Sequence, residues 1–159
     1  MNTRIFTGLA LLCALAFPGL ALAQQPAATP APAMTYELAE QAMTAALAEA
    51  RANNWNLTIV VADLDGIPVM IHRMNGASPR TLEIALSKAK VVTVTGIPSG
   101  EYGTRLAAGQ IAEVEGGVTF AGGVPVMRGG ERIGAVTSSG ARGIEDEQVS
   151  LKGAAAIGN

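Results

Sequence analysis

The sequence predicts one α/β (α+β) domain in which an antiparallel β-sheet is covered by helices. Apolar residues recur at three- and four-residue spacing in separate segments, which is the pattern of amphipathic helices. Between them lie β-branched runs joined by short glycine-containing turns. These connections are too short for the crossovers that parallel strands need. The length of 159 residues favours one domain over two.

Residues 1–23 have the three parts of a secretory signal peptide. Arg4 supplies the positive charge, Leu9 to Phe17 are apolar throughout, and Ala21-Leu22-Ala23 forms a small-x-small cleavage site before Gln24. The apolar run is shorter than the ~20 residues of a spanning helix, which argues against the alternative of a retained anchor. We therefore expect a periplasmic or secreted mature protein without membrane insertion.

Cleavage there would change the chemistry open to the chain. It removes Cys13, the only cysteine, and with it disulfides, thiolate metal ligands and a cysteine nucleophile. It also removes Arg4, so the formal net charge becomes one unit more negative than −2. A mildly acidic chain with scattered basic residues has no electrostatic footprint for nucleic acid or anionic lipid.

Residues 24–33 contain three prolines and no bulky side chain, so we expect a disordered spacer before a domain at residues 34–159. Thr35 can cap the helix that follows, and Asn53-Asn54 ends it after about Ala52. Its apolar positions recur at helical spacing: Leu38, Ala42, Met43, Ala46 and Ala50.

A β-hairpin is expected next. Leu57 to Asp63 and Pro68 to Met74 are strand-like runs, and Asp65-Gly66 between them favours a two-residue turn. A second helix carries apolar side chains at Leu82, Ala85, Leu86, Ala89 and Val92 and should stop before Gly96.

The last third of the chain is rich in glycine. Residues 99–115 suggest a short helix followed by a loop. Two or three short strands should follow, drawn from 118–120, 122–127 and 133–137. A final helix begins near Glu145-Asp146-Glu147, whose charges complement the positive end of the helix dipole.

Several motifs occur together in an order that resembles the GlcG/HbpS family of haem-degrading HbpS-like proteins, over residues 35–158. A similar domain forms the C-terminus of the corrinoid adenosyltransferase PduO. The motifs are Thr35-Tyr36-Glu37-Leu38-Ala39-Glu40, Val61-Ala62-Asp63-Leu64-Asp65-Gly66, Arg73-Met74-Asn75-Gly76-Ala77, Ile84-Ala85-Leu86-Ser87-Lys88-Ala89, Gly122-Gly123-Val124-Pro125, Gly134 to Ala141, and Asp146 with Gly153.

The resemblance implies a profilin-like sandwich with about five strands, a homo-oligomer, and a small-molecule ligand, with haem as the cofactor. Two positions depart from the family pattern. Asn75 stands where the family often has aspartate, so a carboxylate is missing from the loop after the second strand. Thr137-Ser138-Ser139-Gly140 adds hydroxyls where the family often has Gly-Val-Ser-Gly.

His72 is the only histidine and the first candidate ligand for haem iron. Strand alternation places it on one face with Met70 and Met74, and both imidazole and thioether groups are axial ligands of haem. The alternative is a half-buried strand histidine beside methionines that fill the core. One histidine without cysteines does not supply a closed zinc or non-haem iron site.

Two cations complete the candidate binding set. Arg73, on the opposite strand face, is suited to a ligand carboxylate such as a haem propionate, or to an ion pair with Asp63 or Asp65 across the hairpin. Lys88 interrupts the apolar spacing of the second helix at a position where the family also has lysine. It therefore faces a pocket or an oligomer contact, or else lies on a solvated helix face.

Other catalytic patterns are missing from the sequence. The glycines at 116–130 match neither dinucleotide nor P-loop motifs and fit tight turns and close backbone approach. No Gly-x-Ser-x-Gly elbow is present, so Thr137, Ser138 and Ser139 are read as strand-end hydrogen-bonding residues. Catalytic residues thus remain unassigned.

Three functions stay open. The leading hypothesis is an exported binder of haem or a related tetrapyrrole. The second is an enzyme that acts on haem or a small organic acid at a pocket in a homo-oligomer. The third is an accessory protein that presents its surface to an envelope sensor.

Overall fold

The computed structural model describes residues 32–158, so the expected signal peptide and most of the expected spacer lie outside the described residues. The described part confirms an α/β fold with an antiparallel sheet. The elements are α1 (Tyr36–Ala52), β1 (Thr58–Ala62), β2 (Pro68–Arg73), α2 (Arg80–Thr95), α3 (Ser99–Ala107), β3 (Gly123–Arg128), β4 (Glu131–Ser139) and α4 (Gly143–Ala156). None of these helices is long and apolar enough to span a membrane.

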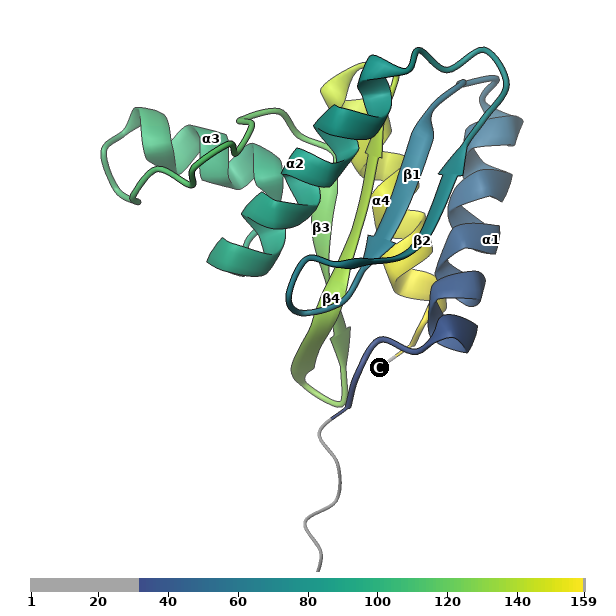
Figure 1. The fold of residues 1–159 in the computed structure, drawn as a ribbon, viewed down its shortest axis with the longest axis horizontal. Helices are drawn as coiled ribbons and strands as arrows, with labels where there is room; N and C mark the ends of the chain where they lie inside the picture. The colour runs from purple at the N-terminus through teal and green to yellow at the C-terminus, as the bar shows by residue number, and fades with distance from the viewer. Residues whose placement is uncertain (1–31, 159) are drawn as a thin grey trace, which may run out of the picture. The chain divides into compact units, whose positions relative to one another are not determined.

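The sheet has the order β2-β1-β4-β3, and each neighbouring pair is antiparallel. Helices cover both of its faces (Figure 1). On one face, Ile59 and Val61 of β1 pack in a core cluster with α1 and α4. On the other face, Val60 and Ala62 pack against Ala85 and Ala89 of α2. The period-two alternation of β1 therefore supplies two cores from one strand.

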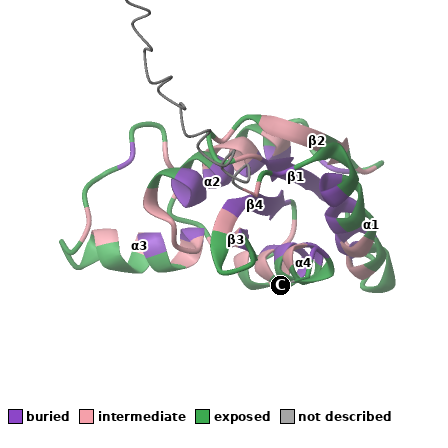
Figure 2. Ribbon diagram, turned by 90° about the horizontal axis from the view of Figure 1, so that it is seen from below, coloured by how far each residue is buried: buried purple, intermediate pink, exposed green. Residues whose placement is uncertain are grey.

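Strand β1 is buried along its whole length, as Figure 2 shows for the centre of the sheet. Its register places Ile59 opposite His72 of β2 on one side and opposite Ser138 of β4 on the other. Strand β2 has only β1 as a partner and is an edge strand, so His72 lies at the border of the sheet.

The hairpin is confirmed, but its turn is longer than the expected two residues. The backbone N–H of Asp63 donates to the carbonyl oxygen of Ile67, which leaves three residues between them. The Asp63 carboxylate accepts hydrogen bonds from the backbone N–H groups of Asp65 and Ile67. Gly66 adopts φ +78°, the left-handed conformation that such three-residue loops require.

The sheet of the described part has four strands, where the family resemblance implied about five. Residues 118–120, expected as a short strand, form a loop in which the carbonyl oxygen of Phe120 accepts a hydrogen bond from Ser99 Oγ of α3. The short helix expected within 99–115 is confirmed as α3. The Tyr102 hydroxyl accepts a hydrogen bond from the Val114 N–H and holds the loop against that helix.

Close packing requires a glycine at position 122. A Cβ there would lie 2.5 Å from Lys88 Nζ, 2.6 Å from Asp146 Cβ and 2.8 Å from the Ser138 carbonyl oxygen, and φ is +122°. Gly130 also has a positive φ, +82°, but has no atom within 4 Å of the added carbon. The expectation of close backbone approach is confirmed at Gly122.

We expect Gly122→Ala to lower the free energy of unfolding by about 3 kcal/mol or more, since backbone strain and overpacking add. Gly130→Ala, which carries strain alone, should cost only about 1 to 2 kcal/mol. Urea unfolding of both variants measures the difference. Equal losses would contradict the tight packing described for Gly122.

Candidate functional site

An open hollow of about 450 Å³ lies at the end of β2. Its lining comes from the last turn of α1, from the segment that leads into β1, from β2, and from the loop that follows β2. The lining residues are Arg51, Asn56, His72, Arg73, Met74 and Asn75. The hollow therefore brings together three of the five residues predicted from the sequence.

His72 is half-buried on the face of the sheet that carries Ile59, its partner in β1. Met70 lies on the same face, as expected, but it packs against the core cluster of α1 and α4 and does not line the hollow. Met74 does both: it lines the hollow and packs against that cluster. The shared face is confirmed, and Met74 is the methionine that accompanies His72 in the hollow.

Arg73 does not form the considered ion pair with Asp63 or Asp65. Its Nη1 donates to the carbonyl oxygen of Ala77 at 3.0 Å. Arg73 ends β2, whereas both aspartates lie in the loop before that strand, so the length of the strand separates them. The Asp63 carboxylate instead accepts backbone N–H bonds within its own loop.

The charges that line the hollow have one sign. Two guanidinium groups, an imidazole and two amides face it, and within the described part none of the lining side chains is acidic. Within residues 32–158, the ion pairs are Lys88–Asp146, Arg105–Glu101 and Arg142–Glu145, so neither Arg51 nor Arg73 is paired with a carboxylate. Such a lining is suited to an anionic group.

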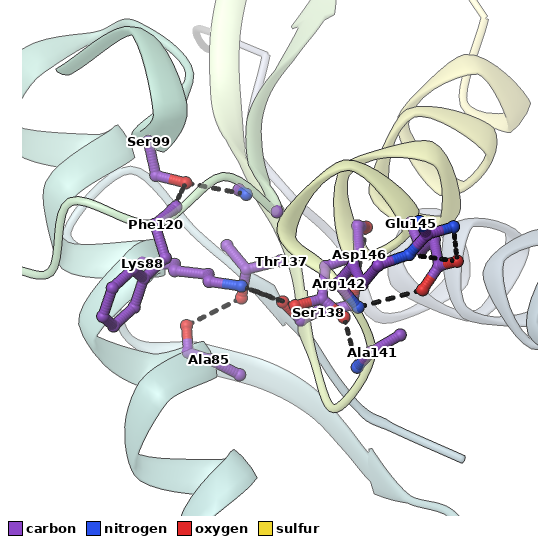
Figure 3. A network of polar contacts seen from close by, with 12 residues as sticks. Ala85, Lys88, Ser99, Phe120, Thr137, Ser138, Ala141, Arg142, Glu145 and Asp146 are labelled. Carbon is purple, nitrogen blue, oxygen red and sulfur yellow. Dashed lines mark hydrogen bonds and ion pairs between the residues drawn. The ribbon is translucent and has the colours of Figure 1, made fainter. Parts of the chain in front are cut away.

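Lys88 lies elsewhere, and the solvated helix face considered for it is wrong. Its side chain is 1% exposed, and Nζ donates to the Ser138 carbonyl oxygen at 2.7 Å and to Asp146 Oδ2 at 2.9 Å (Figure 3). The other carboxylate oxygen, Oδ1, accepts from the Ala141 N–H at 3.0 Å. Because α2 and α4 cover opposite faces of the sheet, the lysine passes beside Gly122 to reach its partner.

The surrounding hydroxyls complete this buried network. Ser138 Oγ donates to the Asp146 carbonyl oxygen, and Ser150 Oγ donates to the Gly122 carbonyl oxygen at 2.8 Å. On the α2 side, Thr137 Oγ1 donates to the Ala85 carbonyl oxygen at 2.8 Å. The hydrogen-bonding role expected of Thr137 and Ser138 is confirmed, and the network ties β4 to both helices.

Burial acts on both charges of the pair. Desolvation lowers the pKa of Lys88, and the opposing attraction of Asp146 offsets only part of this effect. Desolvation likewise raises the pKa of Asp146 against the stabilising charge of Lys88. Each group is therefore held closer to its neutral form than in water.

Asp146 lies in the first turn of α4, where its charge was expected to complement the helix dipole, but it is buried at 3% exposure and paired with Lys88. Glu145 fulfils that role, because its side chain accepts a hydrogen bond from the Arg142 backbone N–H in a capping box. A signal for the buried pair was present in the sequence: Lys88 shares helical spacing with Ala85, Ala89 and Val92, the buried side of α2.

Arg51 and Asn56 were not predicted as site residues. In the sequence, Arg51 is an ordinary basic residue of the last helical turn, where its charge complements the helix dipole. Its place in the hollow depends on how α1 lies beside β2, which no local pattern encodes (Figure 1).

Comparison with known proteins agrees with this fold. The family model described as haem degrading protein HbpS-like matches residues 34–155. The chain belongs to the HbpS-like family. This confirms the resemblance stated from the sequence motifs.

Individual relatives support the assignment. The chain is 33% identical to Protein GlcG of Escherichia coli strain K12 over 105 residues, which is 65% of this chain and 78% of that protein. A structure of a double mutant of Streptomyces reticuli HbpS has a TM-score of 0.75 at 29% identity and covers 89% of this chain and 99% of its own. A complex of PduOC with heme has a TM-score of 0.68 at 23% identity, covering 80% and 96% of the chains, and shows the shared fold.

The buried pair predicts a pH dependence of stability. The folded-state pKa of Lys88 lies below its ordinary value of 10.5, so between the two values the unfolded chain binds more protons. The free energy of unfolding should therefore rise as the pH rises through that window.

The reference for this measurement is the double variant Lys88→Met/Asp146→Asn, which removes both titrating groups. Chemical unfolding from about pH 7 to pH 10.5 should show wild type gaining stability relative to the variant. A difference that stays flat or falls over this range would contradict the lowered pKa.

Proposed function

We propose that this protein binds haem or a related tetrapyrrole at the hollow beside β2, with His72 as the ligand of the iron. The observation that carries the proposal is a half-buried imidazole in a hollow lined by cations and a thioether. Membership of the HbpS-like family supports it, and a structure with the same fold was determined as a heme complex.

The residues present fit such a ligand. Within the described part, the His72 ring takes part in no protein hydrogen bond, so the imidazole is not committed to another partner. The hollow has a volume within the range of about 300 to 1,000 Å³ that is usual for ligand sites. Arg73 can bind a propionate, and the thioether sulfur of Met74 is a second atom of a type that binds haem iron. When bound, haem would supply an iron centre for small-ligand binding or electron transfer.

The lining also favours a second candidate, a small organic acid as ligand or substrate. Within the described part, no phenylalanine, tyrosine or tryptophan lines the hollow, so it lacks the large rings that stack well on a planar macrocycle. Hydrogen-bond donors dominate instead, and they suit carboxylates whatever molecule carries them. Turnover of either ligand would make the protein an enzyme.

We expect hemin titration of the mature protein to shift its Soret band, and His72→Ala to weaken binding by about tenfold or more, equivalent to about 1.4 kcal/mol. Met70→Leu is the matched control, because Met70 lies on the same strand face but outside the hollow. Met74→Leu tests the thioether.

A spectrum that hemin leaves unchanged would remove haem as the ligand. Equal binding by wild type and His72→Ala would remove His72 as the residue that holds it. A loss in Met70→Leu as large as that in His72→Ala would show damage to the core rather than to the hollow.

We further propose that the protein is exported and that the mature form assembles into a homo-oligomer. Expression with its own N-terminus should give a periplasmic or secreted product whose intact mass corresponds to residues 24–159. A product that retains residues 1–23 would contradict export by cleavage. Light scattering during gel filtration measures the assembly, and a monomer at all concentrations would refute it.

A further inference from the structure

Arg51 brings a charge to the hollow that the fold leaves uncompensated. It lies in the last turn of α1 and is exposed, and it lines the hollow together with Asn56, His72 and Arg73. No side-chain hydrogen bond or ion pair joins its guanidinium to another residue of the described part.

Glu49, the acidic residue closest to Arg51 along α1, forms hydrogen bonds to other residues. Glu49 Oε1 accepts hydrogen bonds from Asn53 Nδ2 at 3.1 Å and from Gln148 Nε2 of α4 at 2.5 Å. These contacts engage its carboxylate at the α1–α4 junction, away from Arg51. The guanidinium therefore keeps its hydrogen-bonding capacity for a group that enters from solvent.

The second guanidinium of the hollow is partly fixed. Arg73 Nη1 is bonded to the Ala77 carbonyl oxygen, which restrains its side chain and leaves its other donors free in the described structure. The two arginines come from α1 and from β2, so they reach the hollow from separate elements. Asn75, which also lines it, contributes an amide without a negative charge.

We propose that Arg51 is a specificity-determining residue of the hollow and forms with Arg73 a binding site for carboxylate groups. Arg51 forms charge-assisted, bidentate hydrogen bonds to a ligand carboxylate. The inference rests on the proposed function in placing the ligand at this hollow. The same chemistry serves the propionates of haem or the carboxylates of a small organic acid.

Three probes distinguish a haem propionate from the carboxylate of a small organic acid: hemin, hemin dimethyl ester and succinate. The ester has the macrocycle and iron but no free carboxylate, whereas succinate has carboxylates alone. Arg51→Gln should weaken binding of hemin by about tenfold, because hemin loses a charge-assisted contact to its carboxylate. Binding of the ester should stay unchanged, because the ester has no free carboxylate. Absorption titration measures the haem compounds and calorimetry measures succinate.

A second variant tests the sign of the charge without truncating a side chain. Asn75→Asp places a carboxylate of nearly the same shape in the hollow. Repulsion between like charges should therefore weaken the binding of hemin and of succinate but not the binding of the ester. Arg128→Gln, an exposed arginine of β3 outside the hollow, is the control for net charge and should bind all probes as wild type does. Urea unfolding confirms that the variants are folded.

The outcomes separate this inference from the proposed function. Hemin binding that Arg51→Gln and Asn75→Asp leave unchanged overturns the carboxylate site while haem stands. Succinate binding that both variants weaken, without any binding of hemin or its ester, supports the carboxylate site and overturns haem. Failure of wild type to bind any of the three probes overturns both.

Discussion

The burial of β1 on both faces is the constraint on which the rest of the structure depends. A strand that is covered on both sides cannot slip by one residue without moving each side chain into the opposite core. Its register is therefore strongly specified, and it sets the positions of both neighbours. Ile59 lies opposite His72 in one direction and opposite Ser138 in the other. One register thus places the hollow at the sheet edge and the polar network on its far side.

The buried ion pair between Lys88 and Asp146 links α2 to α4. Taking both charges out of water carries a desolvation cost that their attraction offsets only with good geometry and further hydrogen bonds. Here those bonds come from backbone groups of the strand end and of the loop before α4. Because few alternative packings satisfy both charges, we infer that the pair contributes more to the uniqueness of the arrangement of α2 and α4 than to its net stability.

Sequence periodicity was sufficient for the elements whose pattern is local. The first two helices, the hairpin and the last helix follow from spacing, capping and turn residues, and Thr35 caps α1 as expected. The hairpin turn is one residue longer than expected, and the other errors occur where distant segments decide. Residues 118–120 are β-prone but form a loop in which Phe120 bonds to Ser99 of α3. Asp146 was expected to complement the dipole of its own helix, and only the fold brings Lys88 of α2 to it. The hollow was half predicted, since His72, Arg73 and Met74 share one stretch of chain while Arg51 comes from α1.

The hollow lies on an edge strand, and this links occupancy to local motion. Strand β2 is held by hydrogen bonds to β1 alone, so its backbone can open at a lower free-energy cost than that of the strands inside the sheet. A ligand that binds only the closed edge adds its binding free energy to that opening cost. Saturation of the hollow would then slow amide hydrogen exchange along β2 while leaving β4 nearly unchanged. A bound ligand would thus hold closed one of the two edge strands of the sheet.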